Sequence, residues 1–148
     1  MQNECMNIYK KARLAAGIKS QQIAAEHLHI SVRSLADYET GVTVPPEDVV
    51  CGMIELYRNR WLGYQHLQEH SEIGRRYLPK IQETDLAVAV LRLQKEVRDI
   101  DNIHSTMVEV ACDGKIDPHE KSLWGKVEKE VSDVAGAAMA LVFVGSTT

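Results

Sequence analysis

A chain of 148 residues, of which 45% are apolar and only 5% aromatic, holds one domain or two small ones packed mainly by aliphatic side chains. Its three cysteines, Cys5, Cys51 and Cys112, lie far apart without CxxC spacing, which excludes a disulfide framework and indicates a reduced, cytoplasmic protein. Polar residues follow Met1, so we expect no signal peptide. The longest apolar run, residues 134–144, is too short to span a bilayer, and we expect no membrane partner.

The net charge of −4 is unevenly distributed along the chain. Up to Arg60, seven basic residues balance seven acidic ones, whereas the rest of the chain holds ten basic and fourteen acidic residues. A neutral first part does not by itself indicate nucleic-acid binding, so a basic surface there has to come from local clustering. Good helix formers dominate while Pro and Gly are sparse, which predicts an all-α fold.

Four short helices with tight turns are predicted within residues 5–58. Gly17 ends the first helix, Ser20 caps the second, and the third runs from its cap at Ser31 to Gly41. Pro46 suits the first position of the fourth helix. Apolar residues at helical spacing give the expected inward faces: Cys5, Ile8, Ala12 and Ala15; Ala24, Ala25 and Leu28; Leu35 and Tyr38; and Val50, Met53, Ile54 and Tyr57.

The pattern changes after residue 60. One helix or a broken pair is expected over residues 61–78, followed by a long helix from Thr84 to Gly114 and a last helix that a capping box of Asp117 and Glu120 begins. The expected packing residues are Trp61, Tyr64, Leu67, Ile73 and Tyr77 in the first; a heptad seam of Leu86, Val90, Leu93, Val97, Ile100, His104, Met107 and Ala111 in the second; and Leu123, Val127, Val131, Val134, Ala138 and Leu141 in the third. This predicts an antiparallel helical hairpin and a division of the chain into residues 1–58 and 59–148.

Residues 12–41, "ARLAAGIKSQQIAAEHLHISVRSLADYETG", carry several features at fixed spacing. These are Arg13 four residues before Gly17, Gln21 at the start of the second helix, Ala25 in a small-residue position, Ile30 and Ser31 before the third helix, and Tyr38, Glu39 and Gly41 at its end. The stretch resembles the Cro/phage-repressor (XRE) family of helix-turn-helix DNA-binding domains. The resemblance covers about the first 58 residues and implies a lambda-repressor-like domain ahead of the C-terminal hairpin or bundle.

The resemblance implies that the third helix lies in the major groove with its first residues at the base edges. Arg33 would be the main base reader, because its guanidinium matches guanine O6 and N7, while Val32 would favour a thymine methyl group. Ser34 could bond a base or a phosphate, and Asp37 could accept only from a donor such as cytosine N4. The remaining implied DNA contacts, mostly to phosphates, are Lys19, Ser20, Gln21, Ser31, Thr40 and Thr43; Ser31 is first a helix cap.

The resemblance also implies a structural ion pair between Arg13 and Glu39. Some residues depart from the family pattern: Lys19 is an extra residue, Ala24 is small, and His29 replaces the turn glycine. Together with acidic Asp37, they argue against tight binding to DNA by a single copy.

Other motifs have plain structural explanations. Residues 113–120, "DGKIDPHE", resemble half of a calcium loop, but Ala111 cannot supply a ligand and a capped hairpin turn explains the sequence. His66 and His70, one helical turn apart, lack the HExxH pattern, and we expect solvated side chains. His104 in the seam could set the helix register. We expect no metal, no cofactor and no enzymatic activity.

Taken together, the sequence predicts a dimeric transcriptional regulator, by family likeness a repressor, that reads a palindromic operator in double-stranded DNA. Residues 59–148 would form the homodimer and could receive a regulatory protein. Met139, Val142, Phe143 and Val144 favour such an interface, although they could instead pack on residues 61–78. The alternative is an antirepressor or other protein-interaction module with a helix-turn-helix fold that does not read DNA.

Overall fold

The computed structural model describes residues 7–146, and within that range it is all-helical, without strands. The contacts divide the described residues into two compact units, which we call the first unit (residues 7–78 with 145–146) and the second unit (residues 79–144). No helix among the described residues has both the length and the apolar character needed to cross a membrane. Cys5, expected on the first helix, lies outside the described residues.

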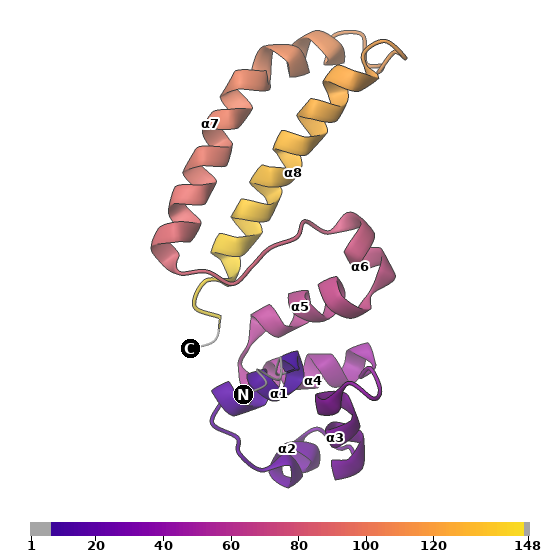
Figure 1. Cartoon of the computed structure of the whole chain (residues 1–148), viewed down its shortest axis with the longest axis vertical. Coiled ribbons are helices and arrows are strands. Elements are labelled where there is room, and N and C mark those ends of the chain that lie inside the picture. Colours follow the sequence, from indigo (N-terminus) through magenta and orange to yellow (C-terminus); the bar gives the residue numbers. More distant parts are fainter. Residues whose placement is uncertain (1–6, 147–148) are drawn as a thin grey trace, which may run out of the picture. The chain divides into compact units, whose positions relative to one another are not determined.

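Among its described residues, the first unit contains six short helices (Figure 1). They are α1 (Ile8–Ala15), α2 (Gln21–His27), α3 (Val32–Thr40), α4 (Glu47–Tyr57), α5 (Arg60–His70) and α6 (Glu72–Tyr77). Local chemistry sets their ends, since Ser20 and Ser31 accept backbone N–H groups at the starts of α2 and α3. Gly41 ends α3 with a φ of 76°, in the left-handed region that favours glycine, while His29 adopts the same region at 54°.

The core of the first unit is formed by residues of all five helices from α1 through α5. Its buried apolar residues are Ile8, Tyr9, Ala12, Ala24, Ala25, Leu35, Val50, Met53, Tyr57 and Leu62. Most were expected from helical spacing, although Ala15 of α1 is exposed. Leu62 of α5 is fully buried in this core, and Trp61 and Tyr64 are buried beside it along the chain. The contacts therefore divide the chain between residues 78 and 79, whereas the sequence predicts a division between residues 58 and 59.

Helix α6 does not bury the apolar residues expected of it. Ile73 and Tyr77 are 73% and 77% exposed. The inward position belongs to Gly74, where an added Cβ would lie 2.1 Å from the carbonyl oxygen of Leu67. Because this close approach turns Gly74 toward α5, the neighbouring side chains of the short helix point away from the core.

The second unit consists of two long antiparallel helices, α7 (Leu86–Ala111) and α8 (Lys121–Phe143), which pack along their length (Figure 1). Asp85 caps α7 by accepting from the N–H of Val88 at 2.9 Å. A segment before α7 packs on α8, since Ile81 is buried and a Cβ at Gly136 would lie 3.3 Å from Pro79. Helix α8 begins at residue 121, four residues after the expected cap.

Only some of the predicted packing residues of α7 and α8 are buried or half-buried within this helix pair. On α7, Leu93, Ile100 and Met107 are half-buried, whereas the other five members of the predicted heptad seam are exposed. The buried residues are instead Ala89 and Val110, and Ile103 is half-buried. Each of these three residues directly precedes a seam residue in the sequence. On α8, Val127 is buried, Leu123 and Val131 are exposed, and Val134, Ala138 and Leu141 are half-buried. Each helix therefore packs on the other with one edge of its apolar face.

Candidate nucleic-acid interface

Helix α3 presents its first residues to solvent because its inner side is anchored. Leu35 and Glu39, four residues apart, are both buried. Val32 is 44% exposed, Arg33 is exposed, and Asp37 is half-buried. The guanidinium of Arg33 thus has the exposure that reading a base edge requires.

Several hydroxyl groups near α3 already have hydrogen-bond partners inside the protein. The Oγ atoms of Ser34 and Ser31 lie 2.8 Å apart, and Ser31 Oγ also accepts the N–H of Ser34 at 2.9 Å. Thr40 Oγ1 donates to the carbonyl oxygen of Ala36 at 2.8 Å. These side chains first stabilise the helix, as Ser31 was expected to do, and any contact of theirs with DNA would share or replace these bonds.

Arg13 and Glu39 form a buried, bidentate ion pair between α1 and α3. Arg13 Nε lies 2.6 Å from Glu39 Oε1 and Nη2 lies 2.8 Å from Oε2, and the two side chains are 3% and 1% exposed. The hydrogen bond to Glu39 raises the pKa of Arg13. Arg13 Nη1 also donates to the carbonyl oxygens of Ile18 and Lys19, at 2.7 and 2.8 Å. The pair therefore fixes α3 to α1 and to the loop that precedes α2.

Gln21, expected to hold a phosphate, takes part in the same cluster. Its Nε2 donates to Glu39 Oε2 at 2.8 Å, so the side chain links the start of α2 to α3. Tyr57 of α4 is buried beside the cluster, where burial and the carboxylate of Glu39 raise its pKa to about 12. No helical spacing signals that these four residues meet, because each comes from a different helix.

The other expected contact residues surround the start of α2 and the end of α3. Lys19 and Thr43 are exposed, and Ser20 Oγ accepts the N–H of Ile23 at 3.4 Å. Only Lys19 among these carries a positive charge. The candidate interface thus combines one exposed arginine and one exposed lysine, which can contact base edges and phosphate oxygens.

His66 and His70 of α5 are not the solvated pair that the sequence suggested. His66 is only 7% exposed, and its Nδ1 lies 2.7 Å from the hydroxyl oxygen of Tyr9 on α1. The ring of His70 stacks on Tyr9 at a centroid distance of 5.8 Å. Tyr9 is 57 residues away in sequence from His66, so sequence spacing could not reveal this contact.

Lowering the pH should decrease the free energy of unfolding of the first unit, because His66 is harder to protonate when folded. Burial and the nearby His70 lower its pKa, against a smaller opposite effect of Glu47. The unfolded chain, with an ordinary pKa near 6.5, then binds more protons than the folded one. The contribution of His66 to the free energy of unfolding is therefore fully present above about pH 6.5, and it is lost as the pH falls through the pKa that His66 has in the folded state. Urea unfolding between pH 8 and 5 should show this slope in the parent chain and a smaller slope in His66→Gln. The same substitution at exposed His119 should keep the parent slope, and equal slopes in all three would contradict the assignment.

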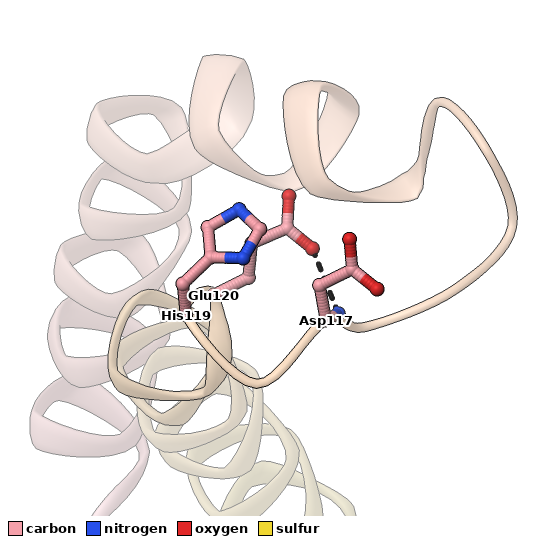
Figure 2. Close-up of side chains that lie close together, drawn as sticks. All are labelled: Asp117, His119 and Glu120. Atoms are coloured by element: carbon pink, nitrogen blue, oxygen red, sulfur yellow. Dashed lines mark hydrogen bonds between the residues drawn. The ribbon is translucent and has the colours of Figure 1, made fainter.

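The turn between α7 and α8 contains three side chains with potential metal-ligand atoms (Figure 2). Asp117 and His119 are exposed and Glu120 is half-buried, and Glu120 Oε2 accepts the N–H of Asp117 at 2.9 Å. This is half of the expected capping box. Helix α7 continues through Glu109 to Ala111, where a calcium loop would need ligands. The turn that joins α7 to α8 accounts for this group, and surface carboxylates by themselves define no metal site.

The comparisons with known proteins found no matching family model, no similar curated protein and no similar solved structure.

Proposed function

We propose that the protein is a sequence-specific, DNA-binding transcriptional regulator, in which α2 and α3 act as a helix-turn-helix and α3 enters the major groove. The observation that carries the proposal is the exposed Arg33 at the start of a helix whose opposite side is held by buried Leu35 and Glu39. An arginine presented in this way can donate two hydrogen bonds to guanine O6 and N7. Exposed Val32 beside it supplies an apolar contact for a thymine methyl group.

Hydrogen bonds within the protein reduce the number of side chains that are available to contact DNA. Because Ser34, Thr40 and Gln21 have partners within the protein, base reading depends mainly on Arg33 and Val32. Lys19, exposed next to the start of α2, is the principal candidate for a phosphate contact. So few charged contacts give weak binding by one copy. We therefore infer that a dimer reads a palindromic operator with half-sites about 34–36 Å apart, as a repressor does.

Selection of bound sequences from random DNA, followed by binding measurements on the full chain, tests the proposal. Arg33→Ala should lower the preference for the selected site over a variant at its guanine by about 10–100-fold, corresponding to about 1–3 kcal/mol. Lys19→Ala is the matched contrast: it should weaken binding to all sequences and reduce the salt dependence. An unchanged sequence preference in a folded Arg33→Ala protein would show that direct reading by this residue is wrong.

The second candidate is a protein-interaction module or antirepressor that keeps the fold without reading DNA. Asp37 favours it, because a half-buried carboxylate on α3 repels phosphates. Binding to short duplexes should fall steeply with salt if DNA is the ligand. Absence of any such binding, with the fold intact, would favour a protein partner instead.

A further inference from the structure

The second unit leaves a stripe of apolar side chains on α7 uncovered. Its exposed residues Leu86, Val90 and Val97 are 60%, 36% and 49% exposed, and half-buried Leu93 and Ile100 continue the same stripe. We call this stripe, with Leu141 of α8, the open face. Val90, Leu93, Val97 and Leu141 line a groove of about 490 Å³ there, with Gln94 and Arg98 at its edge.

Elsewhere on the pair, exposed lysine side chains form ion pairs within their own helix. Lys95 Nζ lies 2.8 Å from Asp99 on α7, and Lys129 Nζ lies 2.7 Å from Asp133 on α8. Residues 79–82 and Gly136 line a second depression, away from the open face, where Ile81 is buried. A helix with apolar residues at three heptad positions is typical of a bundle in which it contacts two neighbours. Only one neighbour, α8, is present within the unit.

The predicted heptad seam of α7, which contains this stripe, has a spacing that is complementary to itself. Its eight positions are symmetric about a point between Arg98 and Asp99. When two copies of α7 lie antiparallel around that point, each seam residue faces another: Val97 faces Ile100, Leu93 faces His104, Val90 faces Met107, and Leu86 faces Ala111 of the second copy. A stripe with this property fits a second copy of the same chain through a two-fold axis.

The charges beside the stripe agree with the same arrangement. Arg98 lines the edge of the groove, and Asp101, three residues later, is exposed. The antiparallel register places Arg98 of one copy near Asp101 of the other, so that two symmetric pairs of opposite charge enclose the apolar layers.

From these observations we propose that the open face binds a second copy of this chain, with the two α7 helices antiparallel in this register and the two helix pairs forming a four-helix bundle. This inference rests on the proposed function, since it names the surface that would bring two DNA-reading units together. Burial of the exposed leucine and valine side chains supplies the free energy, while Arg98 and Asp101 fix the orientation.

Sedimentation equilibrium of the full chain in reducing buffer, without DNA, tests the proposal. Val90→Glu should raise the dimer dissociation constant at least about 100-fold, because it places a charge among apolar residues. Val88→Glu is the matched control, since Val88 has nearly the same exposure, 37%, but lies two residues away on another face of α7. It should leave the dissociation constant within about 3-fold of the parent.

A charge exchange tests the register. Arg98→Glu and Asp101→Arg should each weaken the dimer about 10-fold, and the double variant should return to near the parent value. A monomeric parent chain, equal effects of the two valine variants, or a double variant weaker than either single one would overturn the proposal. The outcome is independent of DNA reading: Arg33→Ala should leave the dimer unchanged, and a dimer that passes these tests without binding DNA would contradict only the proposed function.

Discussion

Replacing Glu39 by glutamine is expected to lower the free energy of unfolding of the first unit by about 3–5 kcal/mol. The substitution keeps the shape of the side chain but removes its charge. The guanidinium of Arg13, 3% exposed, then keeps only neutral partners in a place that water does not reach. The cost comes mainly from the buried charge that loses its counter-ion, not from the attraction between the two groups.

Urea unfolding in a Trp124→Phe background measures this effect, because Trp61, buried in the first unit, then reports on it alone. The matched control is Glu72→Gln, which breaks the exposed ion pair with Arg76 on α6. It should change the stability by less than about 1 kcal/mol.

Replacement of both charged partners separates the two contributions. A double variant with Met at positions 13 and 39 should be less destabilised than Glu39→Gln, because it leaves no buried charge without a partner. If the double variant is destabilised at least as much as Glu39→Gln, the cost of that substitution does not come from a buried charge without a partner.

Features that depend on neighbours in sequence could be predicted. The caps at Ser20 and Ser31 and the end of α3 at Gly41 follow from which side chains reach the nearest backbone N–H groups and which residue tolerates a positive φ. The Arg13–Glu39 pair, implied by the family resemblance, is present with good geometry. Exposure of Arg33 was predictable because helical spacing puts it opposite Leu35 and Glu39.

Features that depend on which helices meet could not be read from the sequence. His66 has the spacing of a solvated residue, and only its contact with Tyr9 buries it. On α7, apolar side chains occupy three of the seven heptad positions. Two overlapping stripes, one through Val90 and one through Ala89, therefore both have the alternating spacing of three and four residues. The sequence could not decide which stripe α8 covers, and Ala89 rather than Val90 proves to be buried.

Replacing Leu62 by alanine should destabilise the first unit by about 2–5 kcal/mol, although this residue lies outside the domain that the sequence predicted. Leu62 is fully buried and belongs to the same core as Ile8, Met53 and Tyr57, so its loss opens a cavity between α5, α1 and α4. Urea unfolding followed by Trp61 measures the effect, with Ile73→Ala on exposed α6 as the control that should change stability by less than about 0.5 kcal/mol.

The result decides which residues hold α3 in place. If residues 1–58 were self-sufficient, Leu62→Ala would leave their unfolding unchanged, and α5 would be only a connection to the second unit. If α5 completes the core, then under the proposed function the variant should also weaken DNA binding at temperatures where the first unit begins to unfold, with an unchanged sequence preference. Under the proposed function, Arg33 would still read the same base, because the substitution leaves in place Leu35 and Glu39, which anchor α3.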